Sequence, residues 1–385
     1  MIPTPTLALH TSRCGKRLVL LAALTGLIAF LSSLLAGAQP PQGRNVRVMT
    51  QNMNVGNLGT IRMATPDTLP AALAKFYTET VATKPKDRAA AIAKEIKNNA
   101  PDLVALQEVS ILRKGSGATP NDPKIPATEV VHDQLQLLRD ELARLGEYYD
   151  TVAVIPNIDV QFPSTLNFVV RLTDRTVILA RASSNRLKLS NVQVEQFLAQ
   201  PVVSQLTGRF GWGSVDVEVG DQKFRFVTTH LTPVALDQPQ LIAIQKSQAL
   251  ELIQSAGKPD LPGGSVLPVV YAGDFNTVAG LDTYKILVDN SGRIDAWQKK
   301  NPMASCPEPR PEGDHDRSGC TCCQDPNLSN PMSKLDHRID LVIVPPNTDI
   351  AEVRLVGADL ADQTSSHLWP SDHAGLVATF QPPRN

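Results

Sequence analysis

The chain has 385 residues, 42% of them hydrophobic and 19% charged, and this balance indicates a globular protein rather than a disordered one. The formal net charge of −1 excludes a strongly basic protein that packs nucleic acid, and an aromatic content of 5% disfavours a surface of stacked bases. Proline is frequent, at 30 residues, which predicts many fixed turns and limits the helical content.

The N-terminus has the pattern of a secretory signal peptide. Basic residues at positions 13, 16 and 17 precede an apolar run over residues 18–35, and the small residues Ala36 and Ala38 suit cleavage after position 38. Because the run is near the lower limit for a membrane span, an uncleaved anchor is the alternative. Cleavage would remove three positive and no acidic side chains, which changes the net charge from −1 to −4. We expect a secreted or periplasmic protein.

The cysteines agree with export. One lies in the predicted signal segment, and the other four fall within one short stretch: Cys306, Cys320, Cys322 and Cys323. An even number of clustered cysteines in an exported chain predicts two local disulfides. Adjacent cysteines rarely bridge each other because the linkage is strained, so pairing between Cys322 and Cys323 is not expected. A zinc site that includes Asp314 and His315 is the alternative, although the cysteine spacing matches no ordinary zinc pattern.

Hydrophobic periodicity predicts several strands and three helices between the signal and the C-terminus. The predicted strands are Asn45–Asn52, Asp102–Gln107, Tyr149–Ile155, Asn167–Arg171, Thr176–Ala180, Ser214–Val219, Phe224–His230, Leu267–Ala272, Arg338–Val344, Ala351–Val356 and Leu376–Phe380. The predicted helices are Pro85–Asn99, Glu129–Leu145 and Asp237–Ser255.

Two segments lack periodicity. Ser110–Ala127 is predicted to be a long loop, and the cysteine-bearing segment, at about 302–333, is predicted to be a surface insertion. There is no internal repeat and no linker, so residues 39–385 are predicted to form a single α/β domain. Strands that come in pairs between helices favour a mixed sheet or two packed sheets over a regular βαβ series.

Polar side chains gather where the apolar strands end, which is a usual place for a site in α/β folds. These residues are Asn52, Glu108, His230, Asp274, Asn276, Asp340, Asp372 and His373. The carboxylate and amide groups among them are hard oxygen donors that suit Mg²⁺, Mn²⁺ or Ca²⁺. No Ser, Cys or Thr of this set lies in a nucleophile motif, so the pattern predicts metal-assisted attack of water on a phosphoester.

Six short motifs follow one another in a familiar order: TQNMN, LVALQEV, TTHL, AGDFN, RIDLVIV and SDHAGL. In this order they resemble the endonuclease/exonuclease/phosphatase superfamily, the DNase I-like proteins, over roughly residues 46–380. The resemblance implies a four-layer α-β-β-α sandwich, in which two mixed sheets pack face to face and helices lie outside. It also implies one or two divalent cations, Mg²⁺ or in its place Mn²⁺ or Ca²⁺.

The resemblance assigns roles to the polar residues. Asn52 and Glu108 would lie at the first metal, with Glu108 as its direct ligand, and Asp372 is similar to the carboxylate that some members use for a second metal.

Asp274 and Asn276 resemble the pair that orients the attacking water and holds the phosphate. His373, partnered by Asp340, resembles the catalytic histidine, and His230 resembles the second histidine, which contacts the scissile phosphate or protonates the leaving group.

Two family features are harder to place. Arg209 is the candidate for an arginine that grips the phosphate, and Asp174 is a candidate acidic partner for the second histidine. The family tyrosine has no clear counterpart, because Tyr148 and Tyr149 come too early in the chain.

These observations predict an exported, metal-dependent phosphodiesterase that acts as a monomer without a stable protein partner. A nuclease is the first expectation for its substrate class. A sphingomyelinase-like or inositol-phosphate phosphoesterase is the close alternative, since no run of lysine and arginine marks a groove for nucleic acid. A binding protein that keeps the fold without turnover is the third, and it would have no need for so many buried carboxylates.

Overall fold

The computed structural model describes residues 43–115, 121–182, 186–203, 206–234, 237–256, 266–303, 306 and 319–383. These residues belong to one compact unit. The predicted signal segment and the possible zinc ligands Asp314 and His315 lie outside the described residues. Within the described part of the chain, no helix is long and apolar enough to cross a membrane.

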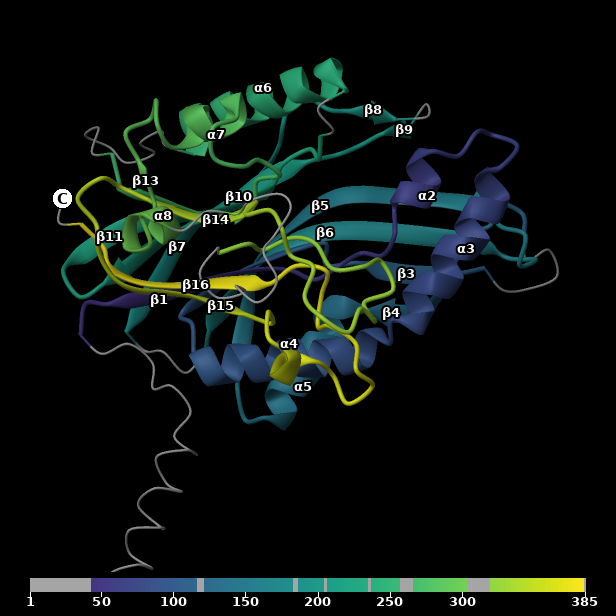
Figure 1. The fold of residues 1–385 in the computed structure, drawn as a ribbon, viewed down its shortest axis with the longest axis horizontal. Helices are drawn as coiled ribbons and strands as arrows, with labels where there is room; N and C mark the ends of the chain where they lie inside the picture. Colours follow the sequence, from purple (N-terminus) through teal and green to yellow (C-terminus); the bar gives the residue numbers. More distant parts are fainter. Residues whose placement is uncertain are drawn as a thin grey trace, which may run out of the picture. The chain divides into compact units, whose positions relative to one another are not determined.

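The first sheet has eight strands in the order β15-β16-β1-β2-β6-β3-β4, with β5 also paired to β6 (Figure 1). Their bounds are β1 Val46–Asn52, β2 Leu103–Gln107, β3 Ile111–Lys114, β4 Glu129–Asp133, β5 Tyr149–Pro163, β6 Val169–Arg181, β15 Asp349–Val356 and β16 Gly375–Gln381. Strands β1 and β2 run parallel, and the other pairs are antiparallel.

The second sheet has six strands in the order β13-β14-β12-β11-β10-β7. They are β7 Leu187–Gln196, β10 Gly211–Val219, β11 Gln222–His230, β12 Val269–Asp274, β13 Ile294–Asp295 and β14 Asp340–Val344. Only β11 and β12 are parallel neighbours among these described strands. Strands β8 Val202–Val203 and β9 Leu206–Thr207 form a separate two-stranded antiparallel ribbon.

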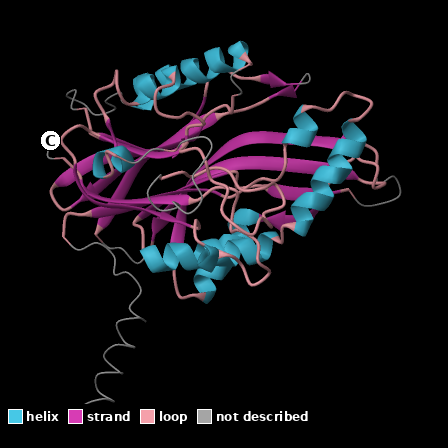
Figure 2. Ribbon diagram, viewed as in Figure 1, coloured by secondary structure: helices cyan, strands magenta, loops and turns pink. Residues whose placement is uncertain are grey.

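The helices flank the sheets, the longer ones on the outside (Figure 2). They are α2 Gly59–Arg62, α3 Leu69–Ala82, α4 Pro85–Asn99, α5 Gln134–Arg144, α6 Pro239–Ala256, α7 Asp282–Leu287 and α8 Ala296–Lys300, with one 3-10 turn at Leu360–Asp362. In Figure 1, α6 and α7 lie on one side of the sheets and α4 and α5 on the other.

Three apolar clusters show the four layers. The central cluster joins the facing sides of the two sheets, for example Val48 and Ile178 of the first sheet with Phe226 of the second. A second cluster packs α6 and α7 on the outer face of the second sheet, and a third packs α4 and α5 on the outer face of the first. The fold is therefore the predicted sandwich of two mixed sheets between helices, because each sheet buries both of its faces.

Several predicted elements need correction. The predicted loop 110–127 contains β3, which pairs through its backbone with β4 and β6. The predicted helix Glu129–Leu145 begins with a strand, and the helix starts only after Asp133, whose side chain accepts hydrogen bonds from the amides of Leu135 and Gln136. The strands predicted at 167–171 and 176–180 are one long strand, β6. Helix α3 and strand β7 were not predicted.

The second half of the cysteine-bearing segment is not a surface insertion. Cys320, Thr321 and Cys322 are buried, and the peptide of Cys322 forms bridges with those of His337 and His373. Cys306 pairs with Cys320, and Cys322 pairs with its neighbour Cys323 across a cis peptide bond. The structure therefore pairs the adjacent cysteines, contrary to the expectation that they would not bridge each other.

Candidate active site

The strand directions bring the predicted polar residues to one edge of the sandwich. Strands β1 and β2 end at Asn52 and just before Glu108, and the antiparallel strand β16 starts beside them, two residues after His373. In the second sheet, β11 and β12 end at His230 and Asp274, and the antiparallel β14 starts opposite, at Asp340. Parallel strands that end together and antiparallel strands that begin there place these side chains around one cleft.

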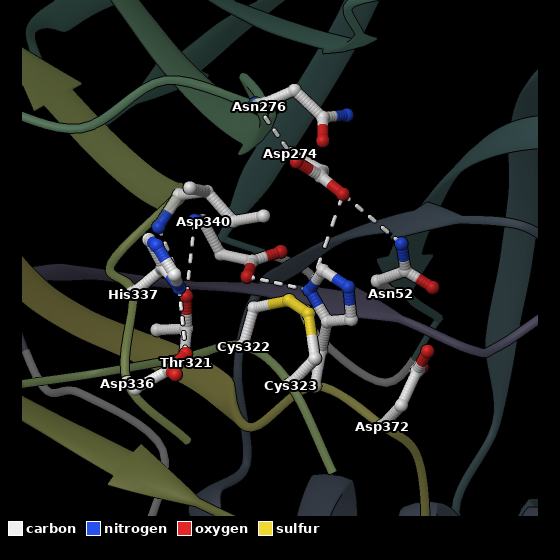
Figure 3. The surroundings of a disulfide bond; sticks show 12 residues. Asn52, Asp274, Asn276, Thr321, Cys322, Cys323, Asp336, His337, Asp340 and Asp372 are labelled. Carbon is white, nitrogen blue, oxygen red and sulfur yellow. Dashed lines mark hydrogen bonds and ion pairs between the residues drawn. A yellow bond between two sulfur atoms is a disulfide. The ribbon is translucent and has the colours of Figure 1, made fainter. Parts of the chain in front are cut away.

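Asp274 lies at the centre of this group (Figure 3). Its Oδ2 atom accepts a hydrogen bond from Nδ2 of Asn52 at 3.1 Å and lies 3.6 Å from Nε2 of His230. Its Oδ1 atom accepts a hydrogen bond from the amide of Asn276 at 2.9 Å. Burial, together with the nearby carboxylate of Asp340, raises the pKa of Asp274 to about 6. This carboxylate is therefore fixed in orientation and can take up a proton near neutral pH.

Asn276 is held by backbone contacts. Its Nδ2 atom donates to the carbonyl of Leu231 at 3.0 Å, and its own carbonyl accepts from Gln245 of α6 at 2.9 Å. Its backbone φ of 48° lies in the left-handed region, which asparagine tolerates better than most residues. The loop after β12 is therefore locked against both β11 and α6.

His373 and Asp340 form a buried pair. The Nδ1 atom of His373 donates to Oδ2 of Asp340 at 2.8 Å. His373 also lines the cleft, and Nε2 is the ring nitrogen not used in this hydrogen bond. Burial lowers the pKa of His373, but the charges of Asp340 and the neighbouring carboxylates offset this effect and hold the pKa well above its ordinary value. His373 is thus a cation that can contact a phosphate.

His230, like His373, lies near Oδ2 of Asp274. Its ring packs edge-on against Phe210 with the centroids 5.7 Å apart, and its Nδ1 atom has no hydrogen-bond partner among the described residues. Asp174, the candidate acidic partner, also lines the cleft, but its Oδ2 atom accepts a hydrogen bond from Nδ2 of Asn157, at 2.8 Å. Burial raises the pKa of Asp174 to about 6, and the charge of His230 opposes that rise.

Glu108 and Asp372 are the two remaining carboxylates of the cleft. Oε2 of Glu108 accepts a hydrogen bond from the amide of Val55 at 2.6 Å. Burial raises the pKa of Asp372, and the charge of Glu108 adds to that rise. A carboxylate whose pKa is raised by burial and by a neighbouring acid is stabilised in its charged form by a cation, so the chemistry of this pair fits a hard divalent metal.

Other members of the predicted set also suit a metal ion. Ligand atoms of Asp274, Asp340 and His373 lie within 4.8 Å of one another. Asn52 is less free, because its Oδ1 atom accepts a hydrogen bond from the amide of Asn54 and its Nδ2 atom donates to Asp274. In this arrangement Asn52 orients Asp274, and Glu108 and Asp372 are the carboxylates open to a cation.

Arg88 of α4 supports this side of the site, and sequence reasoning missed it. It is buried, and its guanidinium donates to the carbonyls of Met53 and Pro370 at 2.8 Å and 3.2 Å. Burial lowers its pKa to about 10, while Asp372 and Glu108 oppose this shift. Arg88 therefore ties the loop after β1 to the loop that carries Asp372 and His373.

The cysteine-bearing segment supports the other side. The hydroxyl of Thr321 accepts hydrogen bonds from the amides of Ile339 and Asp340, at 3.2 Å and 3.1 Å. The amide of Gln324 donates to the carbonyl of Asp372 at 2.9 Å. The Cys322–Cys323 pair lines the cleft beside Asp340 and Asp274, as Figure 3 shows. This segment is part of the wall that holds the His373–Asp340 pair.

The cleft encloses about 950 Å³ and includes most of the predicted site residues. Arg209 is exposed and is not among its lining residues, although Gly208 and Phe210 on either side are. Arg62, at the end of α2, does line the cleft and acts electrostatically on Glu108. Sequence reasoning missed Arg62 because no element is predicted over residues 53–84, although Leu69, Leu73 and Phe76 recur at helical spacing. No tyrosine is among the described residues that line the cleft.

A family model connects this site with known proteins. The model of the Endonuclease/Exonuclease/phosphatase family matches residues 49–373, and the chain therefore belongs to this family. It is a phosphoester hydrolase by family, with the fold and polar cleft described above. A comparison with curated protein sequences finds no match.

Solved structures share the fold. An endonuclease/exonuclease/phosphatase family protein from Bacteroides thetaiotaomicron has a TM-score of 0.52 and 15% identity, over 90% of this chain and 100% of that one. A mannosyl-6-phosphatase from the same organism has a TM-score of 0.51 and 15% identity, over 87% and 99%. TDP2 from D. rerio, complexed with single strand DNA product, has a TM-score of 0.50 and 17% identity, over 88% and 99%.

Proposed function

We propose that this protein hydrolyses a phosphodiester with water as the nucleophile and with one or two divalent cations, Mg²⁺ or in its place Mn²⁺ or Ca²⁺. The observation that carries the proposal is the position of Asp274, whose two oxygens are held by Asn52 and Asn276 between His230 and His373. A fixed carboxylate between two histidines, with further carboxylates in the same cleft, is suited to acid–base catalysis.

The metal would be held by Glu108 and Asp372. When bound, it would neutralise the charge of the phosphate and of these two carboxylates. Asp274 would accept the proton of the attacking water, since its pKa of about 6 leaves it ionised at neutral pH. The cationic ring of His373 would contact a phosphate oxygen, and its Asp340 partner keeps that ring charged and oriented.

His230 would protonate the leaving group. Its Nε2 atom lies 3.6 Å from Oδ2 of Asp274, the same oxygen that lies 4.0 Å from Nδ1 of His373, and its environment includes Phe210 and the acid Asp174. Arg62, rather than Arg209, is the arginine that the cleft offers to a phosphate.

The test is hydrolysis of bis-p-nitrophenyl phosphate by the purified exported protein, with Mg²⁺ or Mn²⁺ and with EDTA. We expect turnover that EDTA abolishes and that added Mg²⁺ or Mn²⁺ restores. Metal-independent turnover, or none with any divalent cation, would contradict the proposal. A single-stranded oligonucleotide belongs in the same panel, because a nuclease was the first expectation from the sequence and the fold accommodates DNA in TDP2 of D. rerio.

We also propose that the protein is exported by its N-terminal segment and works as a monomer. The pairs Cys306–Cys320 and Cys322–Cys323 support export, because disulfides persist in oxidising compartments. N-terminal sequencing of the protein from culture medium or periplasm should begin at Gln39, and an intact N-terminus in the membrane fraction would favour the anchored alternative.

A further inference from the structure

The active-site cleft has an apolar wall that no catalytic role explains. Ile158, Val160 and Phe162 of β5 occupy alternate positions, and all three line the cleft and are half-buried. Alternate residues of a strand share one face, so these side chains form a continuous apolar strip. The strip leads into the same cleft that contains Asp274 and His373.

A second strip comes from the chain between β1 and α3. Leu58, Ile61 and Leu69 also line the cleft, and each is half-buried. Leu58 and Ile61 pack with Val160 against a small cluster around Phe76, which fixes α2 near β5. The two strips therefore belong to one rigid unit and do not depend on a separate element closing over the site.

The charges of the cleft disfavour a nucleic acid. Arg62 is the single lysine or arginine among the described lining residues, while Glu108, Asp174, Asp274 and Asp372 all line it. A nucleic acid is bound chiefly by cationic groups that follow its phosphates, and by aromatic platforms for its bases. In this cleft the proposed divalent cation would bind one phosphate, and much of the remaining lining is apolar.

We propose that the apolar strips bind the hydrocarbon part of a lipid phosphodiester whose phosphate lies at Asp274 and His373. This inference rests on the hydrolase function proposed above and adds the substrate class. Transfer of hydrocarbon from water to an apolar wall favours binding by up to about fourfold for each methylene group that is fully buried.

The test compares three substrates at equal Mg²⁺ concentration: methyl p-nitrophenyl phosphate, octyl p-nitrophenyl phosphate below its micellar concentration, and a single-stranded oligonucleotide. The two esters share a leaving group, so they differ in apolar contacts and not in the chemical step. We expect kcat/KM to be at least about tenfold higher for the octyl ester, and higher than for the oligonucleotide.

The double variant Ile158→Thr/Val160→Thr makes the strip polar, with the side-chain shape kept at Val160 and one heavy atom lost at Ile158. We expect it to reduce the ratio of octyl to methyl kcat/KM several-fold, with a melting temperature close to that of the parent. Val130→Thr, on the exposed face of β4 and outside the cleft lining, is the matched control and should leave the ratio unchanged.

Equal kcat/KM for the two esters, or faster hydrolysis of the oligonucleotide, would overturn the lipid inference while the hydrolase function stands. Hydrolysis of none of the three substrates would instead overturn the proposed function, and the inference with it.

Discussion

His373 and Asp340 are joined by a 2.8 Å hydrogen bond between Nδ1 and Oδ2, although His373 precedes β16 of the first sheet and Asp340 begins β14 of the second. The contact spans the interface between the two sheets at the edge where β1, β11 and β12 end. The charge of Asp340 is also the leading reason why the pKa of His373 is held above its ordinary value. One hydrogen bond thus couples the packing of the sandwich to the charge of the cleft.

Replacing Asp340 with Asn keeps the size of the side chain and removes its charge. The pKa of His373 should then fall, so the limb of the pH–rate profile that His373 sets should move to lower pH. We expect kcat to fall about 100-fold, because the ring loses both its orientation and its charge. The measurement is kcat/KM for bis-p-nitrophenyl phosphate between pH 5 and pH 9.

Asp336→Asn is the matched control for this variant. Asp336 contacts the neighbouring His337 at 2.6 Å, and neither residue lines the cleft. Its pH–rate profile should match that of the parent protein. An unchanged profile for Asp340→Asn would show that the pair has no part in catalysis.

Replacing the buried Arg88 with Met should destabilise the fold and loosen the site. The change removes the donor to the carbonyl of Pro370 and one of the two donors to the carbonyl of Met53, which should lower the free energy of unfolding by about 3 kcal/mol. Urea unfolding measures this change. Arg139→Met, at an exposed position of α5, should cost less than about 0.5 kcal/mol, and similar values for the two variants would contradict the structural role of Arg88.

Much of this molecule follows from its sequence for identifiable reasons. Asn52, Glu108, His230 and Asp274 could be placed because each ends or follows a short apolar strand, and such ends converge in α/β folds. Helix α3 lies in the segment 53–84, for which no element is predicted. Strand β4 is predicted as part of a helix because Val130 and Val131 continue the apolar pattern of α5 ahead of the cap at Asp133.

The supporting groups could not be found in the same way. Arg88 looks like an ordinary charged residue of an amphipathic helix, and only the three-dimensional fold shows that it reaches the carbonyls of two loops. The role of Thr321 depends on a pairing between the cysteine-bearing segment and the start of β14, which has no local sequence signal. Arg209 shares its sequence context with true cleft residues but points elsewhere, since neighbouring residues of an extended chain face opposite sides.

Glu95 of α4 makes stability depend on pH. Its carboxyl group is buried, both oxygens lack a hydrogen-bond partner among the described residues, and burial raises its pKa well above 4.5. Below about pH 4.5 the folded and unfolded states both hold the proton. Above it the unfolded chain releases the proton while the folded protein retains it, so stability falls as the pH rises toward the folded pKa.

Glu95→Gln removes this titration. The melting temperature of the variant minus that of the parent should therefore increase between pH 5 and pH 8. For Glu195→Gln, at an exposed position of β7, the difference should stay constant. A difference for Glu95→Gln that does not grow with pH would mean that its carboxyl is solvated in the folded protein.

The cysteines give a covalent prediction. Intact-mass analysis after alkylation of the exported protein should find no free thiol, and peptide mapping should recover Cys306 linked to Cys320 and Cys322 linked to Cys323. Four alkylated cysteines, or stoichiometric zinc, would contradict the two disulfides.

The central claim is that Glu108 and His373 serve a metal-dependent hydrolysis in one cleft. The most direct test is kcat/KM for bis-p-nitrophenyl phosphate in saturating Mg²⁺ or Mn²⁺, measured for the parent protein, Glu108→Ala and His373→Ala. We predict losses of about 100- to 10,000-fold for both variants, with folded cores shown by cooperative thermal unfolding. Full activity in either variant would contradict the account.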